Sequence, residues 1–353
     1  MRKIVYSILF FILIAGCSKN LDEIKIPEDK VIKKLKNVEN IYDDLYEFEG
    51  KVQLENPGVN EDGKPILAVF FHHLEISDKF IFGITKNNKA YLWNREGEFI
   101  GKVGSKGKGP GEYYSSWEIF FYDDDEICIF DGNRKYILKY KIDEKNKKID
   151  FVKQYDGGNI SLHNFHAYGR RKDNFYFFRE SGIKDIKKGI ITDTKFNVVK
   201  KFHNRENQSD FSYRQTALSE NKIVMRDDLK NFRKSELFSN KIWIYDLKGN
   251  LLREFGTETA KKVKVVIGNY NSYIYLFEYD RDKTNLYVYN INGKFVKKIR
   301  VTNYISKHYD RNDGKTINLI KNGVGNRYFI EEQNPDELDK SSILYIYKFN
   351  PLK

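Results

Sequence analysis

The sequence predicts an all-β fold made of six four-stranded antiparallel sheets around one axis, and three observations predict it. Of 353 residues, 25 are Tyr and 26 are Phe, and aromatic residues suit the half-buried surface of a pleated sheet. A short apolar segment returns six times at intervals of about 50 residues. One sequence motif occurs three times: an aromatic residue, a polar turn with Gly, and an apolar pair.

The six apolar segments mark the second strand of each repeat, because each follows a cluster of turn residues. They are "KFIFGI" from Lys79, "EICIFD" from Glu126, "NFYFFR" from Asn174, "KIVMRD" from Lys222, "YIYLFE" from Tyr273 and "RYFIEE" from Arg327. A four-stranded unit that recurs every 40 to 50 residues or so is typical of a β-propeller blade. The sequence therefore predicts a six-bladed β-propeller with four antiparallel strands per blade.

The repeated motif predicts the hairpin between the third and fourth strands of a blade. Gly97, Gly249 and Gly293 stand where a tight hairpin needs a positive φ, which Gly adopts without steric cost. The second and third repeats lack this Gly, so we expect longer or differently capped hairpins there.

One strand is left over at the start of the repeats, and one is missing at their end. The segment Gly50–Asn56 ("GKVQLEN") has no repeat of its own, and the sixth repeat supplies only three strands before the chain ends. We expect this N-terminal strand to complete the last blade, which closes the ring and covers an exposed sheet edge.

The N-terminus has the layout of an export signal. Arg2 and Lys3 precede an apolar run that is shorter than the roughly 20 residues that span a bilayer. "IAGC" (Ile14–Cys17) resembles a bacterial lipobox, and the resemblance implies cleavage before Cys17 and lipid attachment to it. The alternative is an uncleaved anchor with an incidental Cys. We predict a signal peptide at 1–16, a lipidated tether at 17–48 and a propeller domain at 49–353.

A glycine-rich stretch, "GSKGKGPGEY" (Gly104–Tyr113), joins the first two repeats. A phosphate-binding loop needs Ser or Thr after Gly-Lys and a helix behind it, whereas a strand is predicted here. We interpret the stretch as an inter-blade turn, in which Glu112 can accept backbone N–H bonds. The residues assigned to this turn are Gly104, Gly107, Gly109, Pro110, Gly111 and Glu112.

The region Gly97–Tyr140 resembles the junction of the first two blades in the six-bladed β-propeller lipoproteins of Gram-negative bacteria, relatives of the NHL-repeat class. Their hallmark GxxGxGPGEY stands here as Gly104–Tyr113, and "IFD" follows at Ile129–Asp131. The resemblance implies a propeller in the cell envelope, as an outer-membrane lipoprotein that faces the periplasm or the cell surface. It implies no activity.

The formal net charge of +12 favours acidic partners. The lysines are spread along the predicted strands and hairpins and do not gather with aromatics in a groove, so we expect no nucleic-acid partner. We expect a monomer that contacts the membrane through its lipid and binds an envelope protein, peptide or glycan. Cys128 is expected to be a small buried apolar residue, with no structural disulfide.

The histidines are the clearest candidates for a site in the central channel, because four of the six fall in predicted innermost strands. Such residues can hold a metal ion that acidifies water. Against this, His163 and His166 are three apart and cannot both face the channel along a regular strand. The candidate ligand-binding residues are His72, His73, His163, His166, Trp117 and Arg214.

No Gly-x-Ser-x-Gly nucleophile motif is present in the sequence, and no catalytic residue is assigned. We expect the propeller to be a non-catalytic scaffold that binds a protein, peptide or glycan and needs no cofactor. The alternative is a propeller hydrolase or lyase with a metal ion in the central channel.

Overall fold

The structure is a computed structural model of the 353-residue chain. It describes residues 46–58, 71–85, 87–158, 160, 165–179, 189–202, 216–218, 221–226, 241–256, 263–270, 273–279, 284–301, 316–321, 327–333 and 342–349. Every regular element in these ranges is a β-strand. Within the same ranges no helix has the length and apolar character needed to cross a membrane.

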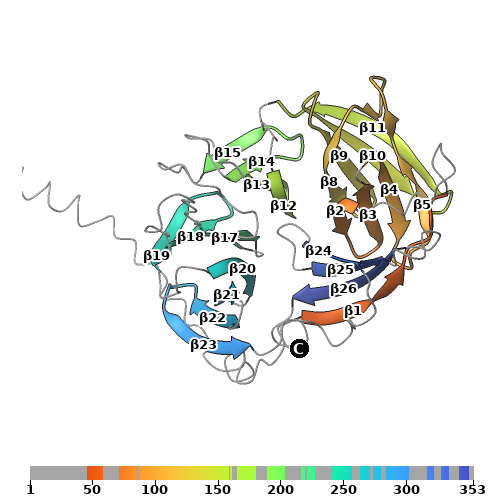
Figure 1. The fold of residues 1–353 in the computed structure, drawn as a ribbon. Helices are drawn as coiled ribbons and strands as arrows, with labels where there is room; N and C mark the ends of the chain where they lie inside the picture. The colour runs from red at the N-terminus through yellow and green to blue at the C-terminus, as the bar shows by residue number, and fades with distance from the viewer. Residues whose placement is uncertain are drawn as a thin grey trace, which may run out of the picture.

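The described strands form six four-stranded antiparallel sheets, the blades, which stand around a common axis (Figure 1). Blade 1 consists of β2 (Phe71–Ile76), β3 (Phe80–Thr85), β4 (Ala90–Asn94) and β5 (Phe99–Val103). Blade 2 consists of β8 (Ser116–Asp123), β9 (Glu126–Asp131), β10 (Tyr136–Asp143) and β11 (Lys148–Asp156). Blade 3 consists of β12 (Phe165–Arg171), β13 (Asn174–Arg179), β14 (Gly189–Thr192) and β15 (Val198–Phe202).

The other three blades repeat this order. Blade 4 consists of β16 (Thr216–Leu218), β17 (Lys222–Arg226), β18 (Lys241–Asp246) and β19 (Leu251–Gly256). Blade 5 consists of β20 (Val263–Tyr270), β21 (Tyr273–Tyr279), β22 (Thr284–Asn290) and β23 (Phe295–Val301). Blade 6 consists of β24 (Thr316–Lys321), β25 (Arg327–Gln333), β26 (Ile343–Phe349) and β1 (Tyr46–Gln53). A short parallel pair, β6 (Ser105–Lys106) and β7 (Glu112–Tyr113), lies between blades 1 and 2.

The prediction of six apolar second strands is confirmed, and the packing of blade 3 shows why these strands are apolar throughout. In β13, Phe175 and Phe177 pack in a cluster shared with blade 2. Tyr176 and Phe178, which alternate with them, pack in a cluster shared with blade 4. Because successive side chains of a strand point to opposite faces, a strand covered on both faces must be apolar at every position.

The hydrophobic core is therefore a series of layers between blades. The described residues form five such clusters, between blades 6 and 1, 1 and 2, 2 and 3, 3 and 4, and 4 and 5. Cys128 is fully buried in the layer between blades 2 and 3. Burial raises the pKa of its thiol, which suits the predicted apolar role.

The hairpin between the third and fourth strands has the predicted glycine geometry. Gly97, Gly249 and Gly293 have φ values of 92°, 71° and 82°. In blade 4 the side chain of Asp246 caps the turn by accepting a hydrogen bond of 2.8 Å from the backbone N–H of Asn250. Blade 3 makes the same turn with Phe196 in the glycine position, at a φ of 62°. The Phe196 ring packs in the layer between blades 2 and 3, and this burial offsets the backbone strain.

The N-terminal strand completes the last blade, as the sequence predicts. β1 pairs antiparallel with β26, from Tyr46 opposite Phe349 to Gln53 opposite Ile343. The strand begins at Tyr46, so the sheet extends into the segment predicted as tether.

The residues that follow β1 join blade 6 to blade 1. The backbone N–H of Leu54 donates to the carbonyl of Ser342 in 2.9 Å, and that of Glu55 donates to the carbonyl of Gly97 in 2.8 Å. The indole N–H of Trp93 donates to the carbonyl of Glu55 in 2.8 Å. The last blade and the first are thus tied by the same stretch of backbone.

We predict that Gly97→Ala destabilises the fold by about 2 to 4 kcal/mol, because Gly97 has a positive φ and an added Cβ would collide with the carbonyl oxygen of Gln53. The matched control is Gly256→Ala, whose Cβ would meet nothing within 4 Å. Urea unfolding followed by circular dichroism measures both variants. Equal stability of the two variants would contradict the packing of the blade 1 hairpin against the end of β1.

Candidate functional site

The innermost strands of three neighbouring blades, 1, 2 and 3, each carry a β-bulge near their start, and that of blade 5 carries another at Lys264. In β2 the register with β3 passes from Phe71 directly to His73, which leaves His72 as the extra residue. Trp117 has the same position in β8, and His166 has it in β12. Each bulge lies opposite the last residues of the second strand, so all three stand at the same end of the ring. Bulges re-aim side chains and are frequent beside functional sites.

We call this end of the ring the bulge face and define it by His72, Trp117, His166 and the segment Gly104–Ser115, which leads into β8. Of these residues, the structure describes the side chains of the Gly104–Ser115 segment but not those of His72, Trp117 and His166. His163 and Arg214 lie outside the described residues. The sequence argument that set His163 apart from His166 assumes a regular strand, and the bulge at His166 interrupts that period.

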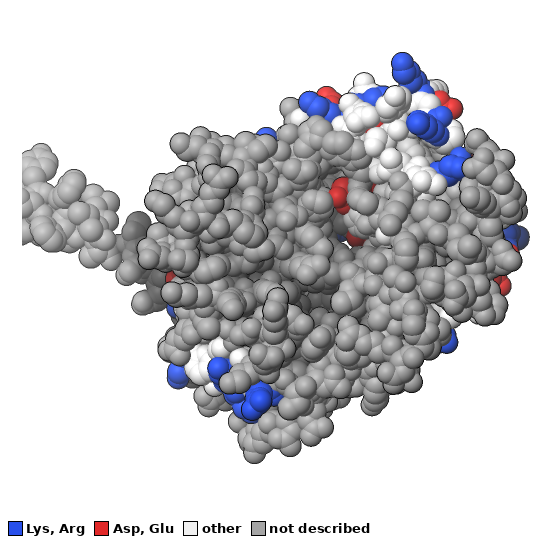
Figure 2. Space-filling view, viewed as in Figure 1, with Lys and Arg blue, Asp and Glu red and all other residues white. Residues whose placement is uncertain are grey.

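His73, the residue after the first bulge, joins two blades through both of its ring nitrogens. Its Nε2 lies 3.0 Å from Oε1 of Glu75 on the same strand. Its Nδ1 lies 2.7 Å from Oε2 of Glu118 on β8, the innermost strand of blade 2. Figure 2 shows acidic side chains on the wall of the central hollow, on the side that β2 and β8 occupy in Figure 1.

The two carboxylates keep His73 charged. Burial acts to lower the pKa of the imidazole, but the charge of Glu118 and the hydrogen bonds from Glu118 and Glu75 outweigh burial and raise the pKa to about 10. The ring is therefore an imidazolium at neutral pH, and it donates from both nitrogens.

This geometry bears on the channel metal that the sequence leaves open. A histidine binds a metal through the lone pair of a deprotonated ring nitrogen, and His73 has none to offer while it bridges Glu75 and Glu118. Across the described ranges, no group of three or more His, Cys, Asp or Glu side chains converges as a metal site would.

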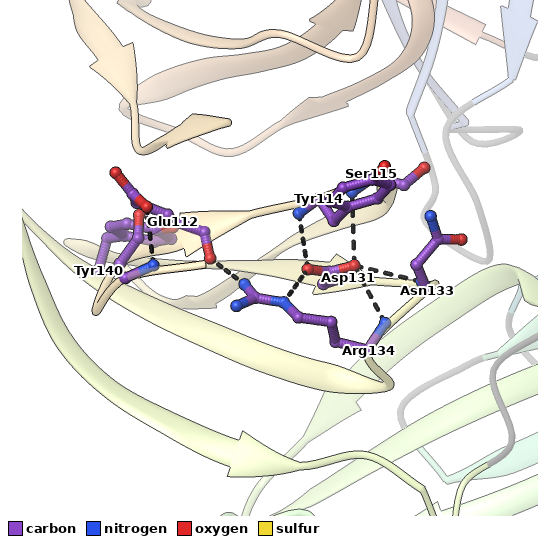
Figure 3. Close-up of polar contacts among 9 residues, drawn as sticks. Glu112, Tyr114, Ser115, Asp131, Asn133, Arg134 and Tyr140 are labelled. Atoms are coloured by element: carbon purple, nitrogen blue, oxygen red, sulfur yellow. Dashed lines mark hydrogen bonds and ion pairs between the residues drawn. The ribbon is translucent and has the colours of Figure 1, made fainter. Parts of the chain in front are cut away.

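The glycine-rich turn on the bulge face is held by a buried carboxylate, Asp131, at the end of β9 (Figure 3). Its oxygens accept hydrogen bonds from the backbone N–H groups of Tyr114 at 2.7 Å, Ser115 at 3.4 Å, Asn133 at 3.2 Å and Arg134 at 3.3 Å. Nε of Arg134 donates a further bond of 2.7 Å. A buried charge is costly unless it is paired and hydrogen-bonded, so these donors fix the backbone on both sides of Asp131.

Further contacts hold the turn from within. Gly104 and Gly111 have φ values of 62° and 72°, which a side chain would strain. The carboxylate of Glu112 accepts the backbone N–H of Gly109 at 2.7 Å and the hydroxyl of Ser105 at 3.3 Å. The guanidinium of Arg134 also donates to the carbonyl of Glu112 (Figure 3). The turn is a rigid structural element.

Sequence reasoning missed Glu75, Glu118 and Arg134. His73 and Glu75 lie two apart on one strand and therefore share a face, so that pair could have been predicted. Glu118 belongs to another blade, and only the packing of blade 1 against blade 2 brings it to His73.

We predict that His73 makes the stability of the protein depend on pH. Its pKa is raised from 6.5 to about 10, so its contribution is fully present below about pH 6.5 and is lost as the pH rises towards 10. Relative to His73→Gln, the wild type should lose on the order of a few kcal/mol of unfolding free energy over this range. Urea unfolding at a series of pH values measures the difference.

The matched control for His73→Gln is Lys79→Gln, which removes an exposed ion pair of 3.9 Å to Asp124. Exposed pairs contribute little, so this variant should follow the wild-type pH profile. Parallel profiles of His73→Gln and the wild type would show that the pairs with Glu75 and Glu118 do not stabilise the fold.

The structure resembles solved structures of low sequence identity. One is a Bacteroides fragilis protein, which is named as an exported protein by inference. It aligns with 12% identity over 88% of this chain and 97% of its own, with a TM-score of 0.50. A DUF4221-family member from Bacteroides vulgatus aligns with 10% identity over 86% of this chain and 97% of its own, with a TM-score of 0.49. BamB from Moraxella catarrhalis aligns with 11% identity over 78% of this chain and 71% of its own, with a TM-score of 0.40. At 12% identity, the similarity to the Bacteroides fragilis protein shows a shared fold and nothing about function.

Among curated protein sequences, none matches this chain. The family model of DUF5128, described as a 6-bladed beta-propeller, matches residues 66–253, which is more than half of the sequence. That stretch contains the blade 1 to blade 2 junction and its buried Asp131. The chain therefore belongs to the DUF5128 family of six-bladed β-propellers.

Proposed function

We propose that this propeller is a lipid-anchored protein of the cell envelope whose bulge face binds a protein, peptide or glycan without catalysing a reaction. The observation that carries the proposal is the repetition of one bulge, at His72, Trp117 and His166 on three neighbouring innermost strands and at Lys264 on that of blade 5. A bulge interrupts the sheet ladder, and a fold that places one at the same point of four blades concentrates irregular backbone at one end of the channel. Rigid scaffolds commonly bind through such irregular ends.

The state of His73 favours binding over metal-assisted hydrolysis or lyase chemistry. To ligate a metal, His73 would have to give up a proton held with a pKa of about 10 and break a hydrogen bond to Glu75 or Glu118. His73 instead forms two ion pairs, one with Glu75 on its own strand and one with Glu118 on the neighbouring blade.

The lipid anchor is proposed from the N-terminal sequence, in which Cys17 follows an apolar run and two small residues. An envelope location agrees with the inferred export in the name of the Bacteroides fragilis protein. The described chain enters the propeller at Tyr46, on the outermost strand of blade 6, so a tether that starts at Cys17 would reach the rim of the ring.

We predict that purified protein contains far less than one bound transition metal ion per chain, because both ring nitrogens of His73 are held by Glu75 and Glu118. Elemental analysis by mass spectrometry after dialysis measures the content. His73→Gln serves as the matched variant. Stoichiometric metal in the wild type that disappears in His73→Gln would instead support the metal-dependent enzyme.

We predict that the wild type incorporates labelled fatty acid and that Cys17→Ala does not, because the Cys17 sulfur is the proposed site of attachment. Cys128→Ala is the control, since it removes the other cysteine of the chain and leaves the proposed attachment site intact. Metabolic labelling followed by electrophoresis and intact-mass measurement reads out the result. An unlabelled wild type that keeps residues 1–16 would establish the uncleaved anchor.

A further inference from the structure

The glycine-rich turn of the bulge face presents two lysines and a tyrosine to solvent. Lys106 and Lys108 are exposed, and Tyr114 keeps 49% of its surface accessible. Nζ of Lys106 lies 5.8 Å from the centre of the Tyr114 ring, a distance at which a cation is attracted to an aromatic face. Lys106 and Tyr114 therefore form one small basic and aromatic surface, and Lys108 follows two residues later in the same turn; we call these three residues the loop patch.

The backbone beneath the loop patch is held in place before any partner arrives. The backbone N–H groups of Tyr114 and Ser115 are bonded to the buried carboxylate of Asp131. The turn is also closed by Glu112, whose carboxylate receives the N–H of Gly109. Binding of a partner here costs little conformational entropy in the loop, because these hydrogen bonds already hold the loop backbone.

The outward charge of the loop patch is positive. Glu112 is occupied by Ser105 and Gly109 inside the turn, and Asp131 is buried against Arg134. Lys135, exposed in the neighbouring turn of blade 2, adds a further positive charge on the same face. Asp156, at the end of β11, is exposed there too, and its carboxylate receives the N–H of Gly158.

Tyr114 differs from the other exposed large apolar side chains of the described residues. Those side chains lie on the outermost strands of four different blades, and they are Val152, Val199, Leu251 and Phe295. Scattered exposed apolar residues are normal on a protein surface. On the rim, Lys298 also lies over a tyrosine, Tyr287, but that ring is buried and cannot contact a partner.

We propose that the loop patch is the docking site for an acidic, extended segment of a partner protein. Lys106 and Lys108 are separated by one residue, so two exposed positive charges follow each other along the turn and can pair with neighbouring carboxylates of an acidic chain. This spacing favours a peptide over a glycan. Tyr114 supplies a large contact surface at low entropic cost, as tyrosines do at the centre of interfaces. The inference rests on the proposed binding function and names its partner class.

The test uses the full chain purified in detergent and a fluorescein-labelled decapeptide of glutamate as the probe. Fluorescence anisotropy at low salt gives the Kd. We expect Lys106→Gln/Lys108→Gln to raise the Kd at least about tenfold, and Tyr114→Ser to raise it severalfold, with binding weakened by added salt.

The matched control is Lys201→Gln/Lys298→Gln, which removes the same charge from two exposed rim lysines on β15 and β23. We expect less than about a twofold change in Kd, because these two lysines lie on other blades, outside the loop patch, and the attraction between charges weakens with distance. Thermal melts establish that each variant is folded.

Three outcomes overturn the inference. They are no binding of the decapeptide to the wild type, an equal loss in the loop and rim variants, or loop-dependent binding of dextran sulfate without binding of the decapeptide. The last outcome would assign the loop patch to an anionic glycan. Each of these leaves the non-catalytic role standing, whereas stoichiometric channel metal would overturn that role whatever the peptide does.

Discussion

The fold depends on strands that are apolar on both faces. The side chains of β13 and β9 alternate between two hydrophobic layers, one shared with the preceding blade and one with the following blade. A single blade would leave both of these apolar surfaces in water, so each blade is stable only between two neighbours. The first and last blades face the same requirement. The chain meets it by adding β1 to β26 and packing Leu54 with Leu344 and Trp93.

Ring packing also fixes two very different charged groups in blades 1 and 2. Asp131 is buried without exposure and is satisfied by backbone N–H groups and by Arg134, so it acts as a fixed anchor for the turn that carries Tyr114. His73 lies between Glu75 and Glu118 on the innermost strands of blades 1 and 2 and holds these two blades together. Both groups make their hydrogen bonds inside the protein. The side chains of Lys106, Lys108 and Tyr114, in contrast, are exposed to solvent.

This division between inward and outward groups, as the described residues show it, supports the proposed role in recognition. A catalytic or metal-binding centre needs side chains with free lone pairs or transferable protons at a reactive point. His73 holds its protons tightly under the charges of two carboxylates, and Cys128 is sealed in a hydrophobic layer. A binding surface needs rigid backbone and accessible aromatic and charged groups, and the turn between blades 1 and 2 provides both.

The sequence by itself determined the number of blades, the position of each second strand and the need for β1 to complete the last sheet, because apolar alternation and turn residues are local signals. For blade 3 the sequence predicted a longer or differently capped hairpin, but the structure has the same turn with Phe196 in the glycine position. The burial of the Phe196 ring between blades offsets the strain of its positive φ. Only the tertiary structure decided that His73 meets Glu118 and that Tyr114 and Ser115 meet Asp131. Bulges at His72, Trp117 and His166 also break the two-residue period on which sequence arguments about strand faces depend. Contacts between blades are long-range, and no local pattern encodes which side chains the ring brings together.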